Sequence, residues 1–445
     1  MSGLRVAVIG AGASGIGVAR TLRRAGVDFE IIEATSRMGG NWQPDGPSSK
    51  MYETAHLISS KRNTQFADYP MPKEYPAYPR HDRFYAYLND LAQASDLRSS
   101  IRFDSVVTEM RPDGSGWRLV FEAGDDARYD FVVVCNGLLG RPILPRLVSK
   151  ASCESFHAVN HKSSANLRGK RVLVVGGGNS GCDIAVDAAH TAAAVFHSTR
   201  RGYYYMPKFI DGRPTQEWLM DESPKFADPA SYWDHVERTF KMAGFNGVDY
   251  GLPVPDHPIH ACHPIMNSQV LYHVGHGDIV AKPDVLDVRG DVVTFADGSA
   301  EQMDTIIWAT GYEVHLPFLA TSVFDWRREL SSNFLRMVPE RFDNLLFVGY
   351  LNSPSGIGNL VNTMARFATN YILAKERDSD EWRTVRRIAK SNSGLDLGEA
   401  RFMKTARHEF EVDLWKFLRA ANFITAKLQA GEPRAEKSHE AIQYA

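Results

Sequence analysis

The sequence contains a glycine-rich turn near its start whose spacing suits phosphate binding. In VAVIGAGASG, Gly10, Gly12 and Gly15 follow a short apolar run and precede a segment of helical periodicity at 13–25. Glycine lets the backbone approach a pyrophosphate closely, and the N-terminus of the following helix offers free N–H groups. Glu33 ends the next apolar run, where a carboxylate can accept hydrogen bonds from ribose hydroxyls. This arrangement predicts a dinucleotide site.

A second turn of the same form occurs in VLVVGGGNSG, with Gly176, Gly178 and Gly181. No acidic residue ends the strand that follows it; the chain has FHSTRR there, with Arg200 and Arg201. A guanidinium forms charge-assisted hydrogen bonds to a phosphate, which a carboxylate would repel. The second turn is therefore predicted to bind NADP, and the first a dinucleotide without a 2′-phosphate, FAD or NAD. FAD with NADPH is the usual pair for electron transfer between two such cofactors.

The elements that must position these turns are also duplicated. Each turn lies in a strand–helix–strand unit, and each unit has a later strand, in YDFVVVCNG or MDTIIWATG. In both later strands an aspartate, Asp130 or Asp304, stands seven residues before a glycine. The repeat predicts an α/β fold with two Rossmann-like dinucleotide-binding domains.

Composition narrows the function classes. The 445 residues are 44% apolar and 23% charged, with a formal net charge of −2, which does not favour a nucleic-acid partner. No apolar run reaches the ~18 residues of a membrane span. The four cysteines are scattered without a CxxC pair, which fits the cytoplasm and argues against a disulfide reductase. No acid or CxxC pair accompanies the histidines of HPIHACHPI, which Pro258 and Pro264 mark as a loop, so no metal is expected.

The chain resembles the flavin-containing monooxygenases along nearly its whole length. The resemblance rests on both glycine turns and on RMGGNW, MYETAHLISSKRNTQFADYPMP, YPAYPRHDRFYAYL, STRRG and IIWATGY. It implies FAD at the first turn and NADPH at the second. It also implies that an NADPH domain, 161–311, is inserted into a discontinuous FAD domain, 1–160 and 312–445, which ends in a polar tail. Further cofactor-binding residues follow from these motifs: Gly40, Trp42, Asn179, Ser180, Thr310 and Gly311.

The activity that the resemblance implies is oxygenation of a small molecule with O₂. NADPH would reduce the flavin, and O₂ would then give a 4a-hydroperoxide that passes one oxygen to a soft nucleophile, nitrogen or sulfur. The site must exclude water, because the hydroperoxide otherwise decays to H₂O₂. Baeyer–Villiger oxidation of ketones, an uncoupled NADPH oxidase and a non-catalytic flavin-binding regulator stay open as alternatives. The oligomeric state is also open, with a homodimer as one option.

Two departures from the family pattern concern the catalytic site. The family's active-site asparagine aligns with Ile58, which cannot form a hydrogen bond, and His56 or Asn63 is a candidate to replace it. The preferred interpretation is that its absence shortens the life of the hydroperoxide; the other is that Ile58 protects it by excluding water. Of the family fingerprint FxGxxxHxxxY only the histidine survives, as His157, which leaves the reaction type within the family open.

Overall fold

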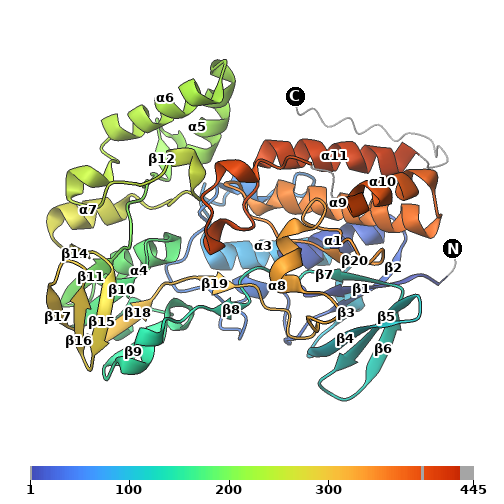
Figure 1. The fold of residues 1–445 in the computed structure, drawn as a ribbon, viewed down its shortest axis with the longest axis horizontal. Helices are drawn as coiled ribbons and strands as arrows, with labels where there is room; N and C mark the ends of the chain where they lie inside the picture. Colours follow the sequence, from blue (N-terminus) through green and yellow to red (C-terminus); the bar gives the residue numbers. More distant parts are fainter. Residues whose placement is uncertain (1–2, 392–394, 431–445) are drawn as a thin grey trace.

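The computed structural model describes residues 3–391 and 395–430, and the predicted polar tail at 431–445 lies outside them. Two α/β units lie side by side, each built around a five-stranded parallel sheet (Figure 1). The strand order of the first sheet is β20-β7-β1-β2-β3. Its strands are β1 (Arg5–Ile9), β2 (Asp28–Ile32), β3 (Ile101–Arg102), β7 (Phe131–Val134) and β20 (Leu345–Phe347). The predicted α/β class is confirmed.

The first sheet is buried on both faces, which explains why its strands read as continuous apolar runs. Val6 and Val8 of β1 belong to a core shared with the helices, whereas Ala7 and Ile9 belong to a second core with Trp117. The helices are α1 (Ala13–Arg24), α3 (His81–Ala94), α9 (Ile357–Glu376), α10 (Asp380–Ser391) and α11 (Leu414–Ala430). The second core is covered by an antiparallel ribbon of β4 (Val107–Asp113), β5 (Gly116–Phe121) and β6 (Asp126–Tyr129).

The second unit repeats this plan. Its sheet has the order β14-β11-β10-β18-β9, with helices on one face and an antiparallel ribbon on the other. The strands are β9 (Glu154–His157), β10 (Arg171–Val175), β11 (Ala194–Ser198), β14 (Ile279–Lys282) and β18 (Thr305–Trp308). The helices are α4 (Asn179–Ala189) and α7 (Gln269–His276), and the ribbon is β15 (Val285–Arg289), β16 (Val292–Phe295) and β17 (Ala300–Gln302). The duplication predicted from the two glycine turns therefore extends to whole layers.

The chain passes between the units twice. The two crossings pair as short antiparallel strands, β8 (Arg141–Pro142) and β19 (Tyr312–Glu313), so the first sheet is completed only after the second. A further helical subregion follows β11 and stands apart from both sheets (Figure 1). It consists of β12 (Phe209–Ile210), β13 (Arg213–Pro214), α5 (Thr215–Glu222) and α6 (Pro229–Met242). Two single-turn helices, α2 (Lys61–Thr64) and α8 (Trp326–Glu329), belong to loops.

Across residues 3–391 and 395–430, no helix has the length and apolar character needed to cross a membrane.

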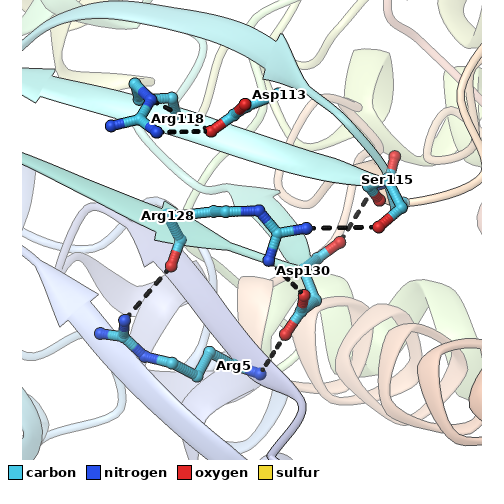
Figure 2. A network of polar contacts seen from close by, with 7 residues as sticks. Arg5, Asp113, Ser115, Arg118, Arg128 and Asp130 are labelled. Atoms are coloured by element: carbon cyan, nitrogen blue, oxygen red, sulfur yellow. Dashed lines mark hydrogen bonds and ion pairs between the residues drawn. The ribbon is translucent and has the colours of Figure 1, made fainter.

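The two aspartates of the internal repeat hold corresponding positions. The Asp130 carboxylate accepts a hydrogen bond of 2.9 Å from the backbone N–H of Arg5, the first residue of β1 (Figure 2). In the second unit the Asp304 carboxylate accepts one of 2.7 Å from the N–H of Arg171, the first residue of β10. Each aspartate also donates its own N–H to the carbonyl of the same arginine. Each repeated aspartate thus joins the start of the strand that leads into the glycine turn to a neighbouring strand.

We expect Asp304→Ala to lower thermal stability without affecting the glycine turn, because the hydrogen bond lies at the opposite end of β10. Losing one charge-assisted hydrogen bond to a partly exposed group costs roughly 1 kcal/mol. This corresponds to a Tm lower by about 2–4 °C for a unit of this size. Scanning calorimetry measures the shift, and Asp90→Ala, at an exposed position of α3, is the control. An equal Tm for the two variants would contradict this role.

Candidate cofactor and active site

The first glycine turn connects β1 to α1, and its three glycines have different tasks. Gly10 has a φ of +103°, and a Cβ built on Gly15 would lie 1.8 Å from the Gly10 carbonyl oxygen. These two glycines are required by the turn itself. Gly12 caps α1 with ordinary extended backbone, and a Cβ on it would meet only the Cα of Gly40, at 3.7 Å. The space in front of Gly12 and the first N–H groups of α1 is therefore open to a ligand.

Glu33 lies beside this turn, directly after β2. Its buried carboxylate accepts hydrogen bonds from the Ala11 N–H at 2.8 Å and from the N–H and hydroxyl of Thr35 at 3.0 and 2.8 Å. Because Oε2 receives only the bond from Ala11, it keeps a lone pair for a ribose hydroxyl. The carboxylate both fixes the turn and stands where the sequence places the adenosine ribose.

The segment with Gly40 and Trp42 crosses the same turn. The N–H of Gly39 donates to the Ala11 carbonyl at 2.9 Å, and a Cβ on Gly40 would lie 3.1 Å from the Gly12 Cα. The half-buried Trp42 ring packs edge-on against Phe84 with a centroid distance of 4.7 Å. The structure thus brings Gly40 to the first turn, while Trp42 anchors the segment to α3.

The second turn, between β10 and α4, has the same stereochemistry. Gly176 has a φ of +128°, and a Cβ on Gly181 would lie 1.8 Å from the Gly176 carbonyl oxygen. Gly178 caps α4. The Asn179 amide accepts from the Met266 N–H at 2.7 Å and donates to the Pro264 carbonyl at 3.1 Å. Its role in the structure is to hold the 264–266 loop against the turn, whereas Ser180 is exposed at the turn's surface.

The two arginines after β11 differ in their surroundings. Arg200 is exposed, and its guanidinium forms no hydrogen bond or ion pair with any residue that the structure describes. Arg201 is half-buried, with Nη1 3.7 Å from the Met403 sulfur and 3.9 Å from an Asp256 carboxylate oxygen. Arg200 is therefore the freer group for a 2′-phosphate.

Thr310 and Gly311 lie where the chain leaves the second sheet. The Thr310 hydroxyl donates to the Ile143 carbonyl, and Gly311 has a φ of +88°. His157 accepts from the Val159 N–H at Nδ1, so its protonated Nε2 donates to the Gly311 carbonyl, at 3.0 Å. Burial lowers the pKa of His157, which favours this neutral form. The surviving fingerprint histidine thus holds the crossing between the units.

The three catalytic candidates do not converge on one point. Ile58 is half-buried against an apolar cluster of the helical subregion, which includes Trp218, Tyr232 and Ile259. His56 is exposed, and its Nδ1 lies 2.7 Å from the Thr54 carbonyl oxygen.

Asn63 lies in α2, and its side-chain nitrogen is 3.4 Å from Oε1 of Gln216. The same Gln216 oxygen accepts the N–H of Ser60 at 3.1 Å, which joins α5 to the loop that carries Ile58. Gln216 was not predicted, because nothing in its local sequence signals a partner more than 150 residues away.

Other supporting residues were also not predicted from the sequence. Buried His197, in β11, contacts the Gly176 carbonyl through Nε2 at 3.0 Å, and burial lowers its pKa. The Asp183 carboxylate of α4 accepts from Tyr52 at 2.8 Å and from Asn267 at 2.6 Å. Tyr52 precedes the Ile58 loop, so this bond connects the two units close to the second turn.

In the loop HPIHACHPI, two histidines each contact a different acidic residue. Nδ1 of His263 lies 3.1 Å from a buried Glu411 oxygen, and Nδ1 of His257 lies 2.8 Å from Asp256. Among residues 3–391 and 395–430, no group of three or more His, Cys, Asp and Glu side chains could hold a metal ion.

Comparison with solved structures agrees with this fold. Oxidized steroid monooxygenase bound to NADP superposes with a TM-score of 0.72, over 96% of this chain and 98% of that one, at 19% identity. A flavin-containing monooxygenase from Stenotrophomonas maltophilia gives a TM-score of 0.61, over 84% of this chain and all of that one, at 20% identity. At such identities the likeness concerns the fold, and the predicted two-unit architecture is confirmed.

Sequence comparison identifies the family. Flavin-containing monooxygenase 5 of Oryctolagus cuniculus is 32% identical over 394 residues, which are 83% of this chain and 73% of the relative. Dimethylaniline monooxygenase (N-oxide-forming) 2 of the same species is 31% identical over 395 residues, 82% of this chain and 72% of the relative. The family model described as flavin-binding monooxygenase-like matches residues 3–427. The chain therefore belongs to the flavin-binding monooxygenase family and is an FAD- and NADPH-dependent oxidoreductase.

Proposed function

We propose that this protein uses NADPH and O₂ to oxygenate nitrogen or sulfur atoms of small molecules. The proposal rests on the two glycine turns, whose neighbouring side chains have opposite charges: a carboxylate lies beside the first turn and an unpaired guanidinium beside the second. That pattern suits two different dinucleotides acting in one electron transfer. The relative from Oryctolagus cuniculus that is named for N-oxide formation supports nitrogen as one target.

The residues present fit both cofactors. Gly12 and Gly178 form cradles that a Cβ would partly fill, and each opens onto a helix N-terminus that can bind a pyrophosphate. Glu33 and Gly40 would complete the FAD site, while Asn179, Ser180 and the two arginines after β11 would complete the NADPH site. Bound flavin supplies the electron transfer and O₂ activation. For each molecule of substrate that is oxygenated, one NADPH, one proton and one O₂ are consumed, and one NADP⁺ and one water are formed.

We propose the same assignment for the domains. The FAD domain comprises the two outer segments and the NADPH domain the segment between them. The second sheet begins with β9 at Glu154, a few residues before 161, so we place the first boundary of the inserted domain near 153. The second boundary lies at Gly311, between β18 and the crossing strand β19.

We further propose that Ile58 keeps water away from the reacting atoms. Its side chain packs against the apolar cluster that includes Trp218 of α5 and Tyr232 of α6, and Gln216 holds α5 against the same loop. An apolar wall suits a reaction in which water diverts reactive oxygen to H₂O₂. This packing supports water exclusion over the interpretation in which a missing hydrogen bond weakens the site.

The first test is product analysis with matched substrates. Incubation with NADPH, O₂ and either dimethylaniline or a thioether should give the N-oxide or the sulfoxide, in nearly one-to-one ratio with NADPH consumed. Mass spectrometry with ¹⁸O₂ should place one labelled atom in the product. A ketone of similar size is the comparison substrate. If only the ketone is converted, and an ester is formed, the result would favour the Baeyer–Villiger reaction. H₂O₂ as the sole product would favour an oxidase.

The second test concerns the first cradle. Gly12→Val should fold normally, because a Cβ there meets only the Cα of Gly40, at 3.7 Å, but it should abolish bound FAD by occupying the place of the pyrophosphate. Flavin absorbance per mole of protein measures the loss, and circular dichroism measures the fold. Gly3→Val is the control, because a Cβ on Gly3 meets nothing within 4 Å. A yellow, fully loaded Gly12→Val protein would refute the assignment.

The third test concerns Ile58. Ile58→Asn should increase H₂O₂ release in the absence of substrate, because a polar side chain admits water to an apolar site. A change of ~1.4 kcal/mol in a barrier alters a rate tenfold, so we expect an increase of up to about tenfold. Peroxidase-coupled detection per NADPH measures it, with Ile58→Val as the apolar control. Less H₂O₂ from Ile58→Asn than from the wild type would instead support a missing hydrogen bond.

A further inference from the structure

A segment of the first unit reaches across to the second glycine turn. Residues 399–413, here called the bridging segment, lie between α10 and α11 in the sequence. On the side of the first unit, its Phe410 carbonyl accepts the Asn352 N–H at 2.8 Å. On the side of the second unit, its Met403 N–H donates to the Ala261 carbonyl at 2.9 Å, and His408 accepts the His263 N–H at 3.4 Å. The bridging segment is therefore fixed to both units.

Arg407 of the bridging segment lies at the mouth of the second turn. A Cβ built on Gly178 would be 3.4 Å from Nη1 and 3.8 Å from Nη2 of Arg407. Gly178 is the residue that caps α4, so the guanidinium lies close to the N-terminus of that helix. The Arg407 side chain is exposed and forms no hydrogen bond or ion pair with any residue of the described ranges. Its position on the cradle is therefore not explained by a protein partner.

Positive charge gathers at this place. Burial raises the pKa of the Tyr203 hydroxyl, and three neighbouring guanidinium groups oppose that rise. They belong to Arg200, Arg201 and Arg407. Of the acids close by, Asp256 has a carboxylate oxygen 3.9 Å from Arg201, and the buried Glu411 carboxylate lies 3.1 Å from Nδ1 of His263. Three arginines close to a helix N-terminus suit a ligand with several negative charges.

We propose that Arg407 binds the pyrophosphate of NADPH and thereby ties the bridging segment to the bound dinucleotide. This inference rests on the proposed function, since it assigns a residue of the first unit to the NADPH site. The two free arginines then have separate tasks. Arg407 stands at the cradle, where NADPH and NADH are identical, whereas Arg200 follows β11, where only NADPH carries a phosphate. The prediction is a difference in cofactor preference between the two variants.

Titration calorimetry of the FAD-loaded protein with NADP⁺ and NAD⁺ tests this without turnover. Arg407→Ala should weaken both ligands by about tenfold, the low end of the range for one charge-assisted hydrogen bond, because the group is exposed. Arg200→Ala should weaken NADP⁺ and leave NAD⁺ nearly unchanged. Arg407→Lys should recover part of the affinity, since an ammonium keeps the charge but not the forked geometry. Arg419→Ala, at an exposed position of α11, controls for the loss of one positive charge.

A second readout is hydrogen exchange in the bridging segment. NADP⁺ should slow amide exchange across 399–413 in the wild type and in Arg419→Ala, but not in Arg407→Ala. Equal affinities for Arg407→Ala and Arg419→Ala, or a loss confined to NADP⁺, would overturn the pyrophosphate assignment. A wild-type protein that binds FAD but no NADP⁺ would overturn the proposed function together with this inference. If the wild type binds NADP⁺ and Arg407→Ala binds it equally well, the inference alone would be overturned.

Discussion

Each strand-to-helix turn has a position at which no side chain fits, and the rest of the structure depends on this constraint. At Gly15 and Gly181 any Cβ would lie 1.8 Å from a backbone oxygen of the same turn, so no other residue allows the helix to start so close to its strand. That closeness directs the helix N-terminus at a ligand lying over the end of the sheet. The sheet order, the buried helices and the supporting groups beneath each turn maintain this geometry. Glu33 and His197 do so in different ways, one through an N–H of the turn and the other through a carbonyl.

Much of this architecture could be predicted because its signals are local. A parallel strand buried on both faces is a continuous apolar run, and a turn of this type demands glycine at fixed spacing. The repeated Asp130 and Asp304 were visible as a pattern, although only the structure explains them, as acceptors for the first N–H of β1 and β10. The position of Glu33 beside the first turn follows from the length of one strand–helix–strand unit, which sequence spacing determines.

The candidate active site was less predictable because its contacts join distant parts of the chain. Gln216 reaches the loop of Ile58, and Arg407 reaches Gly178, across more than 150 residues in each case. Neither residue belongs to a periodic pattern, and the contacts of both depend on how separately folded layers meet. The side-chain chemistry of His56 and Asn63, both near Ile58 in the sequence, makes them candidates. In the structure His56 is exposed to solvent and Asn63 contacts α5, because neighbours in sequence on an irregular loop need not face the same way.

The late completion of the first sheet has a consequence for synthesis on the ribosome. Strand β2 ends at Ile32, but β20 ends only at Phe347, after the whole second sheet has been made. At ordinary elongation rates of about 5–20 residues per second, the first strands are made roughly 15 to 60 s before the last strand of their sheet. The inserted unit, whose strands end at Trp308, emerges complete before then. The nascent chain thus contains a complete second unit while its first sheet still has an open, apolar edge, and an unpaired edge of this kind is where chaperones protect a folding chain from aggregation.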